Sequence, residues 1–405
     1  MQNTKKNILF FIDCFERVSF YKKIADSVDA QVINIVFLTD SLSAYLQLKN
    51  QNIVYLIEKF ALDKEIDISG SLDVLNNNQS ETYAKKYAGC IYGTLDSINK
   101  NIRLDYIFLW NGSGTNGCAI RKFAVDNNIK LGFMELSNFP GKIFVDIKGV
   151  NAKSWLYDNK DILRSKFPNA SFDEDWLTSW HEAKMKPLPQ KQIINRYNRQ
   201  YKIDRFFSII CNRPFCNELN LANLVSKLTK VILNNKETVN ISIDYITKPL
   251  NYIFLPLQVS TDSQLKLNSD YNNIQCILEA EKIAKKKNKK LIVKFHPAEK
   301  NKKEIIDIVE LSKTRGFFIS DDPTMELLSA ADLICVNNST VGLEAKILGK
   351  EVIVFGRALY ESFDRQMAAA YLNHWLIDID YFNGNIVSFT EFNRIIELIE
   401  YSYVN

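Results

Sequence analysis

Three short segments of the chain end in polar side chains that could bind an anion and act on it. In the first, Asn337, Asn338, Ser339 and Thr340 follow the apolar run 333–336 and precede a helical pattern. A helix N-terminus offers unbonded backbone N–H groups and the positive end of the helix dipole. Such a strand-to-helix junction is a seat for a phosphate, although Ser339 or Thr340 alone could be only a helix cap.

A second segment carries a histidine at the end of a strand. Lys294 and His296 lie on the same side of the predicted strand 291–295, and Pro297 then forces the chain out of the strand. This arrangement places His296 at the carboxyl edge of a sheet, where ligands of open α/β sheets bind. Its imidazole could stabilise charge on a departing phosphate, or the histidine could be structural.

The third segment places a carboxylate after a strand. Asp262 follows the apolar run 252–259 through a short polar loop. An Asp at this point is typical of a turn or a helix cap. It is also placed to act as a nucleophile or a base.

The first half of the chain has a carboxylate of its own. Glu135 ends the apolar run 131–135, where a carboxylate is costly unless it is paired or faces water. We interpret Glu135 as an acid/base candidate, with a salt bridge to Lys142 as the alternative. The glycine-rich loop 111–117 would face the same site, but its glycines lack the spacing of a dinucleotide-binding loop.

Strands and helices that alternate along the chain must position these segments. Apolar runs lie at 8–12, 31–37, 53–57, 106–110 and 131–135, and a second series lies at 252–259, 291–295, 317–319, 333–336 and 352–355. Helical patterns separate them, which predicts an α/β fold class with mainly parallel sheets. Two Rossmann-like lobes with a cleft between them form the GT-B-like architecture of many nucleotide-sugar transferases.

Four parts of the chain follow from this pattern. We expect an N-terminal Rossmann-like lobe over residues 1–158 and a mostly helical connection over 159–248. A C-terminal Rossmann-like lobe should cover 249–390. A last helix, over 391–405, should pack back on the N-terminal lobe.

Composition limits the class of protein. A length of 405 residues suits two domains, and 46% hydrophobic with 24% charged residues is ordinary for a folded soluble protein. The net charge of +4 comes largely from Lys-rich stretches at 285–290 and 300–303. We interpret these as solvated helix ends, with a patch for anionic lipid as the alternative. No nucleic-acid recognition motif accompanies them, so nucleic-acid binding is not expected.

Cysteine and histidine usage argues against metal sites and disulfides. The seven cysteines are scattered, odd in number and never spaced as CxxC, which predicts reduced thiols in a cytoplasmic protein. The three histidines lie apart from any cysteine cluster, so a zinc site is not expected. No run approaches the roughly 20 apolar residues that cross a bilayer. Any membrane contact would therefore be peripheral, at the cytoplasmic face of the inner membrane.

Taken together, the motifs resemble the capsule polysaccharide biosynthesis family. The characterised members of this family are retaining β-Kdo transferases that build the Kdo linker of capsules or add Kdo to O-antigen chains. One departure is Leu136 after Glu135, where family members usually carry Gly. The resemblance covers residues 133–360 and rests on Glu135 with Pro140, 149–152 with Ser154, Gln258 and Val259 with 262–264, Tyr271 and Asn272, His296 and Pro297, 325–328, 338–340 with Gly342, and Gly356 with 358–360.

The resemblance implies roles for particular residues. It implies CMP-β-Kdo as the donor, with Asp262 as the nucleophile of a double displacement. We expect Glu135 to be the acid/base or a carboxylate on the acceptor side. The implied donor-binding residues are Gln258, Lys294, His296, Glu326, Asn338, Ser339, Thr340 and Gly342, of which Glu326 would lie near the cytidine. We place Asn111, Ser113, Asn151 and Lys153 on the acceptor side. A helix N-terminus with Lys294 and His296 could neutralise one CMP phosphate, so we expect no metal and no other cofactor.

The resulting hypothesis is a retaining β-Kdo glycosyltransferase that acts on a glycan or lipid-linked acceptor in capsule or O-antigen synthesis. One alternative keeps the fold and changes the donor to another CMP-activated ulosonic acid, such as a relative of sialic acid. Another is a non-catalytic subunit of a capsule assembly complex. The joint presence of Asp262, His296 and Ser339 at strand ends argues against a non-catalytic subunit.

Overall fold

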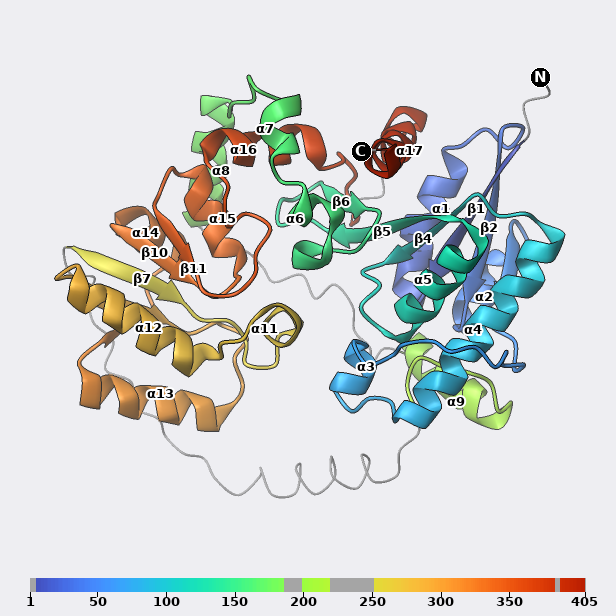
Figure 1. Cartoon of the computed structure of the whole chain (residues 1–405), viewed down its shortest axis with the longest axis horizontal. Helices are drawn as coiled ribbons and strands as arrows, with labels where there is room; N and C mark the ends of the chain where they lie inside the picture. Colours follow the sequence, from blue (N-terminus) through green and yellow to red (C-terminus); the bar gives the residue numbers. More distant parts are fainter. Residues whose placement is uncertain (1–4, 186–198, 219–250, 383–386, 405) are drawn as a thin grey trace. The chain divides into compact units, whose positions relative to one another are not determined.

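The computed structural model describes residues 5–185, 199–218, 251–382 and 387–404, apart from the side chain of residue 263. The chain divides into two compact units. Unit 1 comprises Met1–Trp155, Gln192–Asn234 and Leu376–Asn405, and unit 2 comprises Leu156–Lys191 and Asn235–Trp375. Each unit is built on its own mainly parallel sheet (Figure 1), which confirms the predicted α/β class with two Rossmann-like lobes. The cleft between them stays a prediction.

Unit 1 contains a six-stranded sheet in the order β3-β2-β1-β4-β5-β6, with β6 antiparallel to β5 and the other pairs parallel. Its elements are β1 (Lys6–Ile12), η1 (Phe15–Arg17), α1 (Val18–Asp26), β2 (Ile33–Thr39), α2 (Leu42–Leu48), β3 (Ile53–Leu56), α3 (Leu72–Leu75), α4 (Glu81–Asn101), β4 (Tyr106–Trp110), α5 (Thr115–Asn127), β5 (Lys130–Leu136), β6 (Ile143–Asp146), η2 (Asn151–Lys153), α9 (Arg199–Ile210) and α17 (Phe389–Val404). The short helix α6 (Trp155–Asp158) lies at the boundary of the two units.

Unit 2 contains a five-stranded parallel sheet in the order β11-β10-β7-β8-β9. Its elements are α7 (Ile162–Lys166), α8 (Glu174–Met185), β7 (Tyr252–Pro256), α11 (Ser263–Asn268), α12 (Asn273–Lys286), β8 (Lys290–Lys294), α13 (Lys302–Arg315), β9 (Phe318–Ile319), α14 (Thr324–Ala330), β10 (Leu333–Val336), α15 (Thr340–Ile347), β11 (Val352–Val354), α16 (Arg365–Ala370) and the π-helical turn η3 (Tyr371–Trp375).

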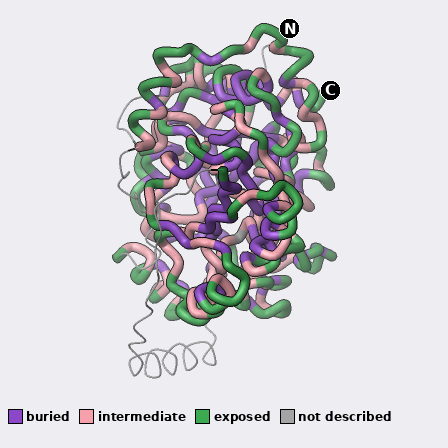
Figure 2. The backbone as a smooth tube through the Cα atoms, turned by 90° about the vertical axis from the view of Figure 1, so that its left-hand side faces the viewer, coloured by how far each residue is buried: buried purple, intermediate pink, exposed green. Residues whose placement is uncertain are grey.

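The central strands are buried on both faces because helices cover both sides of each sheet. Every residue of β4, β7 and β10 is buried, as expected for continuous apolar runs in a parallel sheet. Figure 2 colours the buried stretches of the backbone purple, and exposed stretches, in green, surround them. The core of unit 2 packs side chains of β7, β8 and β10 against α12 and α13.

The two sheets share one topology. Counted along the chain within each unit, the five parallel strands have the spatial order third, second, first, fourth, fifth. The direction of winding reverses between the first and fourth strands, which are β1 and β4 in unit 1 and β7 and β10 in unit 2. Ligands of open α/β sheets bind at this switch point, outside the carboxyl ends of the strands.

The segment 159–248, predicted as a helical connection, contains three helices and the turns between them where it is described, and it is divided between the two units. Helices α7 and α8 lie in unit 2, and α9 lies in unit 1. Residues 186–198 and 219–248 lie outside the described residues. The C-terminal helix α17 packs against β5 and β6 of unit 1, where Lys130 pairs with Glu400 and Tyr403 Oη accepts a hydrogen bond from the Leu131 N–H at 2.8 Å.

Candidate functional site

The switch point of unit 2 is closed by a reciprocal pair of amide side chains. Gln258, after β7, donates through Nε2 to Asn338 Oδ1 at 2.9 Å, and the Asn338 backbone N–H donates back to Gln258 Oε1 at 3.2 Å. Asn338 Nδ2 also donates to the carbonyl oxygens of Gln264 at 3.0 Å and Asn268 at 3.1 Å. These bonds tie the loops after the first and fourth strands together at the position where a ligand is expected.

Asn273 supports the Gln258–Asn338 pair by binding the Gln258 backbone. It is buried, and its Nδ2 donates to the Gln258 carbonyl at 2.8 Å and to Glu304 Oε1 at 2.7 Å. The sequence analysis did not single out Asn273. The sequence feature that could have indicated Asn273 is the pair Asn272-Asn273 at the start of a helix. The Asn272 side chain begins α12 with a capping box.

The N-terminus of α15 lies beside the pair. Ser339 is the N-cap and accepts a hydrogen bond from the Val341 N–H at 3.3 Å, while Thr340 is exposed. Tyr360, buried and also not among the predicted site residues, donates its hydroxyl proton to the Ser339 carbonyl. Gly342 is required here because a Cβ atom would lie 2.5 Å from the Tyr360 ring. Gly342 therefore leaves room for the Tyr360 ring, whose hydroxyl holds the Ser339 carbonyl.

His296 presents one ring nitrogen as a donor. It is half-buried at the end of β8, and its Nδ1 accepts a hydrogen bond from the Ala298 N–H at 3.1 Å. Burial lowers the pKa of His296 below its ordinary value, and the negative charges of Asp262 and Glu299 only partly offset this. The neutral tautomer with a proton on Nε2 follows, so His296 can donate a hydrogen bond at neutral pH.

Glu299 joins the loops after β7 and β8. Its carboxylate accepts from the Ser260 N–H at 2.6 Å and from the Asn301 N–H at 2.7 Å. Burial would raise the pKa of Glu299, but these backbone donors hold it below its ordinary value. The sequence analysis missed Glu299, whose signal was a carboxylate shortly after the His-Pro turn.

Asp262 caps a helix and lies near His296. It is the N-cap of α11, and its Oδ1 accepts from the Gln264 N–H at 2.7 Å. Its negative charge acts to raise the pKa of His296, which opposes part of the lowering by burial. Oδ2 makes no hydrogen bond with any residue that the structure describes. The cap therefore fixes the orientation of the carboxylate and leaves one oxygen for chemistry.

Two predicted donor-binding residues lie toward the outer strand β9. Lys294 Nζ donates to the Asp321 carbonyl at 3.0 Å, and burial lowers the pKa of Lys294, with Asp321 and Asp322 partly opposing the shift. Glu326 lies half-buried in the first turn of α14. The structure thus brings Gln258, Asp262, His296, Asn338 and Ser339 to three adjacent strand ends, and places Lys294 and Glu326 to one side.

In unit 1 the predicted carboxylate is held by two amides. Asn111 Nδ2 donates to Glu135 Oε1 at 3.0 Å, and Asn151 Nδ2 donates to Oε2 at 3.2 Å. Both asparagines have positive φ, 57° and 54° respectively, a conformation that Asn adopts more readily than most residues. The alternative partner of Glu135, Lys142, pairs with Asp378 instead.

The loop from residue 111 to residue 117 leaves little room for a ligand of its own. The N-terminal turn of α5 already receives a carboxylate, because Asp73 Oδ2 accepts from the Thr115 N–H at 3.0 Å. Gly117 packs so tightly that a Cβ atom would lie 2.0 Å from the Gly112 carbonyl oxygen. Ser113 is half-buried nearby. Lys153 lies in η2 with much of its side chain exposed. The partial loss of water around its amine, together with the charge of Arg121, lowers the pKa of Lys153.

The switch point of unit 1 is occupied by the unit's own side chains. Arg17 pairs with Asp13, which follows β1, and its guanidinium lies 4.7 Å from the centre of the Trp110 ring. The Tyr381 ring packs on Trp110 at 5.1 Å between ring centres. The sequence analysis missed this cluster, which joins segments far apart in the chain.

Metal clusters, disulfides and membrane-spanning helices can be judged for the described residues. Within them, no group of three or more His, Cys, Asp or Glu residues could hold a metal ion, and all seven cysteines are free thiols. No helix among the described residues has the length and apolar character to cross a membrane.

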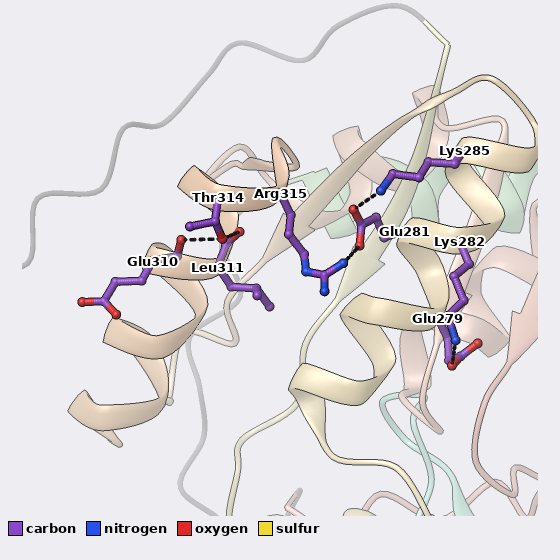
Figure 3. A network of polar contacts seen from close by, with 8 residues as sticks. All are labelled: Glu279, Glu281, Lys282, Lys285, Glu310, Leu311, Thr314 and Arg315. Carbon is purple, nitrogen blue, oxygen red and sulfur yellow. Dashed lines mark hydrogen bonds and ion pairs between the residues drawn. The ribbon is translucent and has the colours of Figure 1, made fainter.

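The Lys-rich stretch at 285–290 forms local ion pairs. Lys285 and Arg315 both pair with Glu281, at 2.6 and 2.9 Å, and Lys282 pairs with Glu279 at 2.7 Å (Figure 3). Lys289 pairs with Asp332 at 2.6 Å. This supports the interpretation as a solvated helix end with locally balanced charge.

The fold and the site define a class of protein: an α/β protein with two Rossmann-like units, one of which carries polar, anion-compatible loops at its switch point. Within that class, the chain belongs to the capsule polysaccharide biosynthesis protein family, whose model matches residues 118–368. The match includes all the predicted donor-side residues together with Glu135 and Asn151.

Individual relatives match over shorter stretches or at low identity. The chain is 32% identical to Protein FixF of Sinorhizobium fredii over 141 residues, which are 31% of this chain and 34% of FixF. It is 32% identical to the capsule polysaccharide export protein KpsS of Escherichia coli over 120 residues, 27% of this chain and 31% of KpsS. The chain thus spans about a third of the length of these curated relatives. Among solved structures, the β-Kdo 2,7 transferase of Thermosulfurimonas dismutans KpsC is 13% identical, with 98% of this chain and 99% of that chain covered and a TM-score of 0.43.

Proposed function

We propose that this chain is a retaining β-Kdo glycosyltransferase that moves Kdo from CMP-β-Kdo to a glycan or lipid-linked acceptor in bacterial capsule or O-antigen synthesis. Membership of the capsule polysaccharide biosynthesis family supports a role in making a surface polysaccharide. The observation that carries the proposal is the junction at the unit 2 switch point. There the Gln258–Asn338 pair joins the carboxylate-bearing loop of Asp262 to the N-terminus of α15.

The donor phosphate is proposed to lie between His296 and the start of α15. The helix offers N–H groups and a positive dipole end, and neutral His296 offers its Nε2 proton. Lys294 adds a nearby positive charge. These groups can stabilise the single negative charge that develops on departing CMP, so we propose that the reaction needs no metal ion. We propose that Glu326 contacts the cytidine.

Asp262 is proposed as the nucleophile. Its carboxylate oxygen forms a bond to the anomeric carbon of Kdo while the bond from that carbon to the phosphate oxygen breaks, and its electron pair leaves with CMP. An acceptor hydroxyl then attacks the same carbon, the Asp262 ester bond breaks, and Glu135 takes the hydroxyl proton. Two inversions give net retention. The amides of Asn111 and Asn151 would orient the Glu135 carboxylate for that proton transfer.

Calorimetry with CMP tests the donor site. We expect the wild-type protein to bind CMP and Ser339→Ala to bind it about tenfold or more weakly, because one hydrogen bond to a charged group is removed. Ser80→Ala is the matched control: Ser80 is the N-cap of α4 in unit 1, and its loss should leave CMP affinity unchanged.

The same assay separates the alternatives. Tighter binding of CMP-Kdo than of CMP-sialic acid supports the proposed donor, and the reverse order favours another ulosonic acid. A protein that folds but binds no CMP contradicts the proposal and favours a non-catalytic subunit.

A further inference from the structure

Helix α9 has the reverse of the usual amphipathic arrangement. Its buried residues are the polar Asp204 and Ser208. Its large apolar side chains are exposed, Ile203 by 44%, Phe206 by 64% and Ile210 by 65%. A surface helix of a globular protein normally turns its apolar stripe toward the core. The outward stripe of α9 therefore lacks an occupant among the residues that the structure describes.

The orientation of α9 is fixed by a polar contact with α2. Asp204 Oδ1 accepts from the Ser43 N–H at 2.7 Å, and Oδ2 accepts from the hydroxyl of Ser41, the N-cap of α2. A carboxylate at a helix N-terminus is favoured by the unbonded N–H groups and the dipole. Turning α9 to bury Phe206 would break both bonds and leave Asp204 unpaired. The apolar stripe is thus held outward.

Positive charge surrounds the stripe. Arg199, Lys202 and Arg205 lie on α9, and none forms an ion pair with the described residues. Arg199 and Lys202 line one open hollow together with Ile203 and Phe206. Between residues 199 and 213 the only acidic side chain is Asp204, which is buried. This differs from the Lys-rich stretch of α12, where neighbouring acids balance the charge.

A basic pocket adjoins the C-terminal end of α9. It has a volume of about 110 Å³, and its lining includes Lys59, Lys86 and Arg213. The guanidinium of Arg213 is held by a hydrogen bond from Nη2 to the Ile57 carbonyl at 2.9 Å, and its Nε is buried without a partner. Phe60, next to Lys59 in sequence, is 65% exposed. Three cationic side chains therefore line a pocket that includes the residues directly after α9.

We propose that the outward stripe of α9 and this basic pocket form a docking surface for an anionic phospholipid membrane. The apolar side chains enter the boundary between headgroups and acyl chains, and the cations contact lipid phosphates. A second copy of the chain fits less well, because a two-fold contact through α9 would bring Arg199, Lys202 and Arg205 of both copies together. The proposal is independent of the donor site in unit 2.

Vesicle sedimentation tests the surface. The 405-residue chain should bind vesicles of phosphatidylcholine with phosphatidylglycerol. It should bind vesicles of phosphatidylcholine alone at least about tenfold more weakly, and salt should reduce its binding to the anionic vesicles. The double variant Phe206→Ser/Ile210→Ser should lower vesicle partition by about tenfold or more. Val125→Ser is the matched control, since Val125 is 78% exposed on α5 of the same unit. It should partition like the wild-type protein.

A second pair of changes tests the pocket. Lys59→Gln/Lys86→Gln should weaken binding to the anionic vesicles several-fold. Lys100→Gln, a control at an exposed position on α4, should bind them like the wild-type protein. Circular dichroism melts establish that the variants fold. The proposal is overturned if wild-type protein ignores anionic vesicles, or if Phe206→Ser/Ile210→Ser binds them normally. It is also overturned if that variant instead dissociates a dimer in sedimentation velocity, or if inorganic phosphate stabilises the protein while vesicles do not bind.

Discussion

Replacing Asn338 by Asp tests the hydrogen bonds at the unit 2 switch point by exchanging one NH2 group for an oxygen. Asn338 Nδ2 donates to two carbonyl oxygens, those of Gln264 and Asn268. The introduced carboxylate cannot donate and would face both oxygens. Two lost hydrogen bonds at about 1 kcal/mol each, with added repulsion, predict a loss of about 2–4 kcal/mol in the local unfolding free energy at neutral pH. Protonation of the carboxyl restores one donor, so the loss should shrink as the pH falls.

Asn272→Asp is the matched control for this prediction. Asn272 is exposed, and its side chain accepts from the Gln275 N–H at 2.9 Å, a role that a carboxylate fills equally well at a helix N-terminus. We expect a change within about 0.5 kcal/mol. Hydrogen exchange measured by mass spectrometry on peptides from β7 and β10 gives both values. Equal protection of these peptides in Asn338→Asp and in the wild type would refute the described role of the Asn338 amide.

Two further predictions concern packing and pH. Gly342→Ala should lower the free energy of unfolding by about 1–3 kcal/mol and weaken CMP binding, because the added methyl group meets the Tyr360 ring. Gly70→Ala is the control, because a methyl group there has open space. It should change neither the stability measured by denaturation nor the CMP affinity measured by calorimetry. Burial raises the pKa of Asp40 to about 7 from an ordinary 3.8. The protonated carboxyl therefore contributes fully to the free energy of unfolding below about pH 4, and this contribution is lost as the pH rises to about 7. The expected fall in the free energy of unfolding is about 4 kcal/mol. Asp40→Asn keeps acceptors for Tyr87 and Cys216, so urea denaturation should show a flatter pH dependence; an unchanged slope would contradict the assignment.

The sequence was a good guide where local chemistry decides structure. Continuous apolar runs make buried parallel strands, and β8 ends at Lys294, one residue before its predicted end and shortly before Pro297. The positions of Asp262, His296 and Asn338 after strand ends therefore follow from local pattern. Glu135 could be recognised as an unusual carboxylate for the same reason. These features depend on residues within a few positions of one another.

Tertiary contacts explain what the sequence did not show. The sequence indicates Asn111 and Asn151 as acceptor-side residues, but no local pattern links them to Glu135. Only the folded structure shows that two positive-φ turns bring both amides to this one carboxylate. Asp204 appeared as one polar residue in a mixed helix, and only its contact with the start of α2 shows that it faces inward. The return of residues 376–405 to unit 1 likewise depends on packing between distant segments.

Intact-protein mass spectrometry after incubation with CMP-Kdo, without acceptor, tests the central claim most directly. The account predicts a covalent adduct with the mass of one Kdo residue on the wild-type protein and none on Asp262→Asn, a variant that can still cap α11 through its side-chain oxygen. An adduct that forms equally on Asp262→Asn, or full turnover by that variant, would contradict the assignment of Asp262 as the nucleophile.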